Sequence, residues 1–156
     1  MAATYTHADG RIIVEAWGKF TALAVAAVKA GDLLYQAAST GVNLATHTTT
    51  ASALTTQARC VAVEDIAAGA RGLCALGILI KDPPTIATGG VVTQGSLAAA
   101  GDEGEPLYLS GTAGEATGTA PTRGGTIIKQ VVGYITAVDE AILCPEVIGL
   151  SLTDTA

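Results

Sequence analysis

The segment ARCVAVEDIAAGARGLCALGILI, which begins at Ala58, is the feature that most constrains how this chain can fold. Two apolar runs, Cys60–Val63 and Leu73–Ile80, enclose a turn built from small and acidic residues. Apolar runs this short, bounded by Gly and Pro, are typical of buried β-strands and too short for most helices. Asp82-Pro83-Pro84 must end the second run, because proline cannot donate to a β-ladder. The segment therefore predicts a strand, a turn and a second strand.

The same pattern of short apolar runs separated by turns recurs along the chain. RIIVEAWGKF, residues 11–20, predicts an alternating strand or an extended arm, and KAGD, residues 29–32, is a turn before the strand-like DLLYQ. Residues 40–57 are rich in Thr and Ala, so we expect a surface loop there, with room for a short helix. PLYLS, residues 106–110, predicts a further strand, and residues 125–152 again predict strand, turn and strand. Many short strands with Gly-rich turns predict a mainly β fold, a small β-barrel or sandwich.

An internal repeat is visible when the sequence is shifted by seventy positions. VAVEDIAAGARGLCALGIL then lies over VVGYITAVDEAILCPEVIG, and GDLLYQAASTG resembles GEPLYLSGTAG upstream at a slightly different offset. The identities of the main shift pair Val61 with Val131, Ala67 with Ala137, Leu73 with Leu143, Cys74 with Cys144 and Ile78 with Ile148. We expect residues 1–30 to form an N-terminal arm or first strand, and residues 31–156 a β-rich domain of two related halves, about 31–80 and 101–150. The alternative is that hairpins of small residues simply look alike.

The composition is unusually poor in charge for its hydrophobicity. Hydrophobic residues make up 49% of the chain, but only 14% are charged, against roughly 25% in a typical soluble domain. Two interpretations stay open. In the first, the many alanines raise the hydrophobic percentage of the chain. In the second, part of the surface is buried against partners, since soluble monomers seldom expose large apolar patches.

The net charge of −6 argues against nucleic acid as a partner, because phosphate binding needs a basic stripe and the eight Lys and Arg residues are scattered. An acidic chain is equally unsuited to a phospholipid surface. The longest apolar run, FTALAVAAV, is far shorter than the roughly 20 residues that span a bilayer. The first residues lack the pattern of a secretory signal, so we expect synthesis in a cytosol and no membrane partner.

Motifs for phosphate or dinucleotide binding are missing, and Ser110 lacks the GxSxG context of a hydrolase nucleophile. A small hydrolase acting through Cys60 or Ser110 would need His7 or His47, the two imidazoles of the chain, as its base. The paired acidic residues at 64–65, 102–105 and 139–140 fall at predicted turns and lack the spacing of a calcium loop. We expect no enzyme activity, no catalytic residues, no cofactor and no metal.

Three cysteines, Cys60, Cys74 and Cys144, are widely spaced and show no zinc-ligand pattern. Their neighbours are apolar, so we expect buried, reduced thiols.

Four segments in this order carry a family resemblance: AGDLLY, ARCVAVEDIAAGARGLCALGIL, GEPLYLSGTAGEATGTAPT and KQVVGYITAVDEAILCPEVI. Together they resemble the small capsid cement, or decoration, proteins of tailed bacteriophages. The likeness runs from about Gly31 to Ile148 and is most specific in VAVEDIAAGARG and in PLYLSGTAGEATGTAP followed by VVGYI. Residues 1–30 match less clearly, and Cys74 and Cys144 lie outside the family pattern.

The resemblance implies a β-rich protein on the exterior of a phage capsid. It implies a homotrimer that bridges neighbouring major capsid proteins and stabilises the shell. Such a protein needs no active site, because its free energy of binding comes from many contacts and from avidity. The runner-up is another β-rich virion component, such as a head fibre base or a minor tail protein; a carbohydrate-binding module is a poorer fit, because the aromatics are scattered.

The candidate contacts with the capsid or with other subunits lie in the N-terminal segment, which holds the sole Trp and the sole Phe. They are Ile12, Val14, Trp17 and Phe20. Aromatic side chains are over-represented among interface hot spots, which favours a clamp made by Trp17 and Phe20. The alternative for Trp17 is that it fills the core of the barrel.

Overall fold

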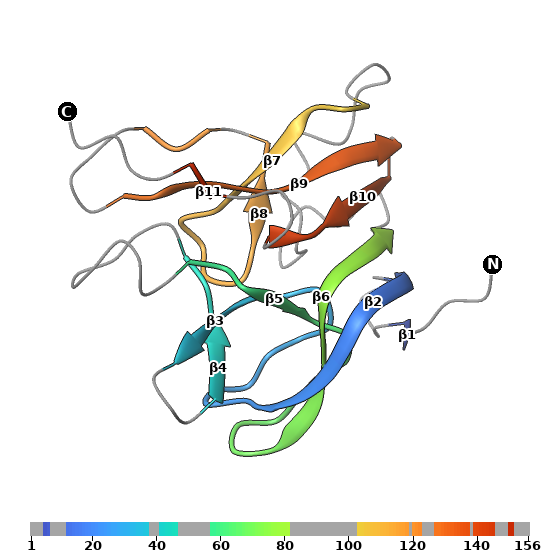
Figure 1. Ribbon diagram of the computed structural model, residues 1–156, viewed down its shortest axis with the longest axis vertical. Helices are drawn as coiled ribbons and strands as arrows, with labels where there is room; N and C mark the ends of the chain where they lie inside the picture. Colours follow the sequence, from blue (N-terminus) through green and yellow to red (C-terminus); the bar gives the residue numbers. More distant parts are fainter. Residues whose placement is uncertain are drawn as a thin grey trace.

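The computed structural model describes residues 5–6, 12–37, 41–46, 57–81, 103–118, 120–122, 127–137, 139–145 and 150–151. Within these ranges the chain is organised by β-strands, drawn as arrows in Figure 1. They are β1 Tyr5–Thr6, β2 Ile12–Leu23, β3 Leu33–Ala37, β4 Gly41–Leu44, β5 Cys60–Ala62, β6 Arg71–Lys81, β7 Pro106–Leu109, β8 Ala116–Thr117, β9 Lys129–Ala137, β10 Glu140–Leu143 and β11 Leu150–Ser151. The prediction of a mainly β, barrel-like fold is confirmed.

The strands form one curled sheet in the order β4-β3-β5-β6-β10-β9-β7-β8, with β2 hydrogen-bonded to β6 as well. The curl brings the end of β2 back to β4, where a parallel bridge joins Ala24 to Val42 and the Val25 N–H donates to the Val42 carbonyl at 2.9 Å. The strands from β2 to β6 therefore wrap into a half-barrel. In Figure 1 this half-barrel lies below, and β7 to β11 lie above it.

The long strand β6 joins the two parts of the sheet. β2 pairs with it from one end to the other, from Arg71 to Lys81. β5 pairs with its first part at Cys74 and Ala75, and β10 pairs with its last four residues, Ile78–Lys81. The apolar run that stood out in the sequence is thus the strand on which both halves are assembled.

The strand order is palindromic: β4-β3-β5-β6 is mirrored by β8-β7-β9-β10. The register follows the seventy-residue shift. On β5 and β6, Ala62 faces Cys74, and after β10 the Cys144 N–H donates to the Val132 carbonyl at 2.8 Å. Adding seventy to the first pair gives the second, so Cys74 and Cys144 occupy matching places. The division into residues 1–30 and 31–156 stays a prediction.

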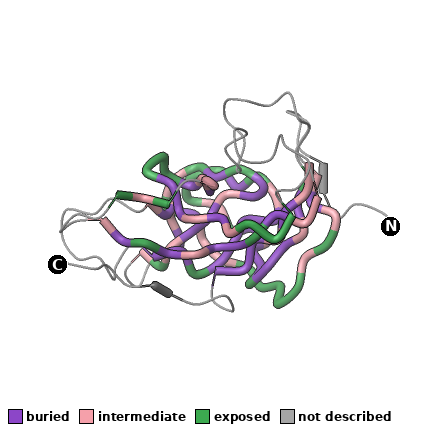
Figure 2. The backbone as a smooth tube through the Cα atoms, turned by 90° about the horizontal axis from the view of Figure 1, so that it is seen from above, coloured by how far each residue is buried: buried purple, intermediate pink, exposed green. Residues whose placement is uncertain are grey.

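Two apolar clusters hold the sheet in this shape. The larger cluster spans both halves and includes Leu33, Ile78, Leu107 and Leu143. The smaller cluster fills the half-barrel with Ala24, Val28, Leu34, Val42, Cys60, Ala62, Ile66 and Cys74. Figure 2 shows the buried backbone running through the middle of the fold. All three cysteines are buried and none forms a disulfide, as predicted.

A buried side chain ties the halves together through hydrogen bonds. Gln130 on β9 accepts from the Ala58 N–H at 2.8 Å and donates to the Ala58 carbonyl at 2.8 Å. The amide thus satisfies both backbone groups of Ala58, just before β5, which would otherwise need a neighbouring strand as their partner.

The prediction for residues 40–57 is wrong at its start, because Gly41–Leu44 is a strand paired with β3. A four-residue strand with one polar residue, Asn43, carries no clear period, and its pairing depends on β3 lying beside it. The rest of the predicted loop, residues 47–56, and the predicted break at 82–84 lie outside the described residues.

Candidate interaction surface

Strand β2 is the exposed strand of the half-barrel. The sequence predicted either a strand or an extended arm for this segment, and residues 12–23 form a strand. Its pairing with β6 runs from Ile12, opposite Lys81, to Leu23, opposite Arg71. Of the twelve residues of β2, only Ile13 is buried. Six of the twelve residues are exposed, so β2 contributes backbone hydrogen bonds to the fold while presenting about half of its length to solvent.

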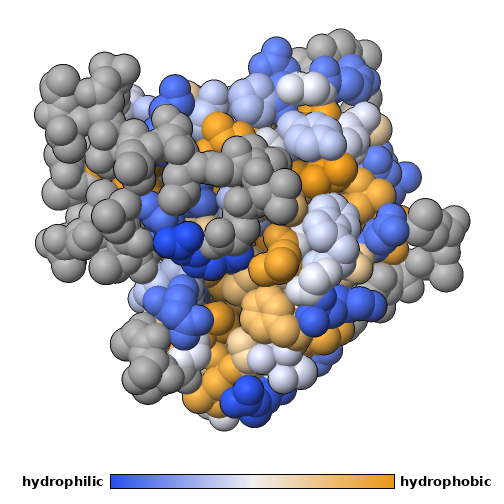
Figure 3. Space-filling view, viewed as in Figure 1, coloured by the Kyte–Doolittle hydropathy of each residue, from blue (hydrophilic) through white to orange (hydrophobic). Residues whose placement is uncertain are grey.

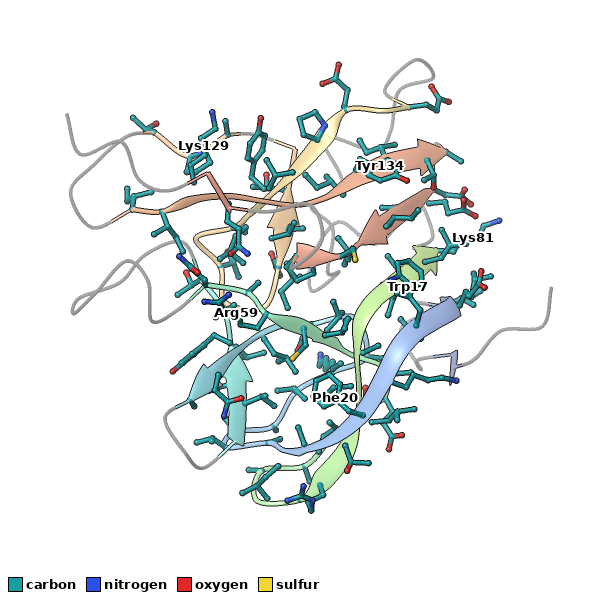
Figure 4. The ribbon with its side chains drawn as sticks, in the orientation of Figure 1. Trp17, Phe20, Arg59, Lys81, Lys129 and Tyr134 are labelled. Atoms are coloured by element: carbon teal, nitrogen blue, oxygen red, sulfur yellow. The ribbon has the colours of Figure 1, made fainter. Side chains whose placement is uncertain are left out.

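Three large apolar side chains of β2 and β6 stay exposed, and we call them the β2–β6 patch: Trp17, Phe20 and Leu76. Their exposed fractions are 36%, 38% and 41%. Figure 4 shows Trp17 and Phe20 spaced along β2, and the space-filling view in the same orientation has apolar surface exposed in that region (Figure 3). Exposed aromatic and aliphatic side chains gathered on neighbouring strands are typical of interaction sites.

Glycines of the two strands support this patch. Trp17 lies opposite Gly77, and a Cβ atom on Gly77 would sit 2.4 Å from the indole ring. In the same way Leu76 rests against Gly18, whose φ of 64° and closeness to the Leu76 Cγ atom both require a glycine. Each bulky side chain thus packs on bare backbone of the neighbouring strand, which fixes its position at the surface.

Beside the patch, a groove of about 490 Å³ opens at the half-barrel. Its lining residues are Phe20, Gln36, Val42, Arg59, Cys60 and Leu76. The walls are mainly apolar, and the Arg59 guanidinium is the charged group of the lining. The groove therefore presents mainly apolar surface.

The structure separates the four candidate contact residues into two kinds. Trp17 and Phe20 are exposed, so the interpretation that Trp17 fills the barrel core is wrong. Ile12 and Val14 are half-buried, and Val14 lies where the β2–β6 register shifts. They therefore offer less exposed surface to a partner than the aromatic pair does.

Sequence reasoning missed Leu76 and Arg59. Leu76 belongs to a strand buried on both faces, so no alternation marked it as exposed. Arg59 directly precedes β5, and only the curl of the sheet brings it to the groove. Tyr134 on β9 is exposed at 40% but lies outside the groove lining.

The acidic residues at turns serve the backbone and nearby side chains. The Asp65 carboxylate accepts from the Ala30 N–H at 2.9 Å, and Asp139 lies 3.4 Å from the Lys81 ammonium. Glu140 accepts from the Thr136 hydroxyl at 2.9 Å. Within the described ranges, no three His, Cys, Asp or Glu side chains are grouped as metal ligands would be.

Ser110, a candidate nucleophile of the hydrolase alternative, is buried, and its Oγ accepts from the Thr112 N–H at 3.1 Å. The hydroxyl thus stabilises a turn. His7 and His47, the bases that this alternative requires, lie outside the described residues. In the part of the chain that the structure describes, no helix has the length and apolar character needed to cross a bilayer.

Comparisons with known proteins complete the description of this surface. No family model, no curated protein and no solved structure matches this chain.

Proposed function

We propose that this protein is a capsid cement protein, which binds the outside of a tailed-phage head as a homotrimer and stabilises contacts between major capsid proteins. The proposal rests on the resemblance of residues 31–148 to that family and, in the structure, on one observation: the β2–β6 patch. Trp17, Phe20 and Leu76 are held at the surface on glycine supports.

The physical requirements of a cement protein fit the described residues. Aromatic side chains that lose water at an interface contribute much of its binding energy. The two strands that carry the patch are paired with each other over ten positions. A rigid surface loses little conformational entropy on binding. The net charge of −6 disfavours contact with packaged DNA, which a protein on the outside of the shell does not touch.

Binding to expanded, undecorated heads tests the proposal. The double variant Trp17→Ala/Phe20→Ala should bind the heads at least about a hundredfold more weakly in co-sedimentation, since a hot-spot side chain contributes about 2 kcal/mol or more and each 1.4 kcal/mol is tenfold. Tyr134→Ala is the matched control, because Tyr134 is an equally exposed aromatic outside the groove lining. If both variants bind as the wild-type protein does, the patch is not the contact surface.

Point substitutions are preferable to a truncation of the N-terminal segment. Removing residues 1–20 would delete most of β2, and with it the pairing to β6 from Lys81 to Cys74. Such a variant would report on folding as much as on binding.

The oligomeric state is a separate part of the proposal. Light scattering of the purified protein should give a mass three times the 15.5 kDa of one chain. The cement function would be contradicted if the protein stayed monomeric at all concentrations and also failed to saturate heads at a fixed ratio.

A further inference from the structure

Two of the three cysteines meet in the half-barrel. Cys60 lies on β5 and Cys74 on β6, and the register places Ala62 opposite Cys74. Since side chains alternate along a strand, Cys60 lies on the same face as Ala62 and is therefore the diagonal neighbour of Cys74. Both thiols belong to the smaller apolar cluster, and the Cys74 thiol is hydrogen-bonded to the Cys60 thiol.

The two thiols differ in how they can be reached. Cys60, although only 3% exposed, belongs to the groove lining beside Phe20, Leu76 and Arg59, whereas Cys74 and Cys144 do not. Cys74 is fully buried behind it. A reagent in the groove therefore meets Cys60 first, and Cys74 is in place to react with whatever forms on Cys60.

The surroundings of Cys74 favour its reactive form. The hydrogen bond with Cys60 is the largest influence and lowers the pKa of Cys74, against burial and the Glu64 carboxylate, which raise it. A lower pKa increases the fraction present as thiolate, and the thiolate is the nucleophile in disulfide exchange.

We propose that Cys60 and Cys74 form a dithiol site at the wall of the groove that reacts with low-molecular-weight disulfides such as oxidised glutathione. Cys60 gives up its proton and attacks one sulfur of the reagent, the S–S bond of the reagent breaks, and the leaving thiolate takes up a proton and departs as free thiol. The Cys74 thiolate then attacks the Cys60 sulfur and releases the second free thiol. The two cysteines lose two electrons, the reagent gains them, and the two thiol protons end on the released thiols.

The second half of the sheet supplies an internal comparison. The seventy-residue shift relates Cys74 to Cys144, but it relates Cys60 to Gln130, whose amide is hydrogen-bonded to Ala58. Cys144 is buried at the matching place without a thiol at the matching partner position. The cross-link needs two neighbouring thiols, which Cys60 and Cys74 supply. Cys144 has no such neighbour at the matching position and should stay reduced.

The disulfide form should be easily reduced. In an ideal antiparallel sheet, diagonal neighbours are about 7–8 Å apart between Cα atoms, slightly beyond the usual range for a disulfide. Closing the bond must therefore distort the pairing of β5 with β6, and strained disulfides have more oxidising potentials.

The test uses the folded, full-length protein, freed of reductant and incubated with oxidised glutathione, followed by peptide mapping in a mass spectrometer. We expect a Cys60–Cys74 cross-link that mild dithiothreitol removes, with Cys144 unmodified. In Cys74→Ser the reaction should stop at glutathione attached to Cys60. Cys144→Ser, the matched control, should form the cross-link at the wild-type rate.

Three results would overturn the proposal. The first is a folded wild-type protein that stays unmodified although its thiols react once it is unfolded in urea. The second is modification of Cys144 at the same rate as Cys60. The third is a Cys74→Ser protein in which Cys60 gains no adduct. If a variant does not fold, mapping of the wild-type protein alone decides, because it contains all three thiols.

Discussion

Gly77 shows how a single residue shapes the surface. It has no side chain where the Trp17 indole approaches β6, and an added methyl group would overlap the ring. Because the backbone of Gly77 is not in the left-handed region, any effect of Gly77→Ala must come from this overlap rather than from strain.

We expect Gly77→Ala to displace Trp17 and to lower the free energy of unfolding by about 1–3 kcal/mol, as overpacking does. Trp17 is the sole tryptophan, so its emission reports the displacement directly. Gly69→Ala is the control: Gly69 has a φ of 79° and open space around it. Its substitution should cost roughly 1–2 kcal/mol through backbone strain alone and leave Trp17 emission unchanged. An unaltered emission spectrum in Gly77→Ala would show that Trp17 does not rest on this glycine.

At the scale of single residues, the sequence identified the aromatic members of the patch but not its geometry. Trp17 and Phe20 stood out as the sole residues of their kind in a strand-like segment. Leu76 and Arg59 could not be found in this way, because one belongs to a doubly buried strand and the other precedes β5. Both reach the surface only through the curl of the sheet.

At the scale of elements, β9 is fastened to the first half by Gln130. Its two hydrogen bonds with Ala58 are buried. Replacing the amide by an apolar side chain of similar size would therefore leave a buried N–H and a buried carbonyl without partners.

The variant Gln130→Leu should lower the free energy of unfolding by about 2–6 kcal/mol, since each of the two buried groups left unsatisfied costs about 1–3 kcal/mol. Urea denaturation measures the change. Gln36→Leu is the matched control, because the Gln36 amide donates to the Gly41 carbonyl in an exposed hydrogen bond. Its cost should stay within about 0.5 kcal/mol. Equal effects of the two substitutions would mean that Gln130 is not a structural link.

The elements with the clearest apolar pattern were the ones that sequence predicted well. β5 and β6 lie within one or two residues of the expected runs. β4 was missed, because four residues with little periodicity form a strand only when β3 provides the hydrogen bonds. Short strands carry too little pattern of their own to be recognised.

At the scale of the whole molecule, the sequence predicted a mainly β fold and suggested a repeat, but not how the parts are joined. The palindromic strand order follows from β6 pairing with β5 and then with β10. This arrangement depends on the length of β6 and on the curl of the sheet. The apolar run at 73–80 predicted the length of β6 closely, but the curl of the sheet and the pairing of β6 with both β5 and β10 are not visible in the spacing of apolar residues.

The central claim is that this protein works by adhesion through the β2–β6 patch. The most direct measurement is an electron-microscopic reconstruction of expanded phage heads mixed with the protein. The account predicts added density on the outer surface of the shell, with Trp17, Phe20 and Leu76 buried against the capsid or a neighbouring subunit. Heads without added density, or bound protein whose patch faces solvent, would contradict it.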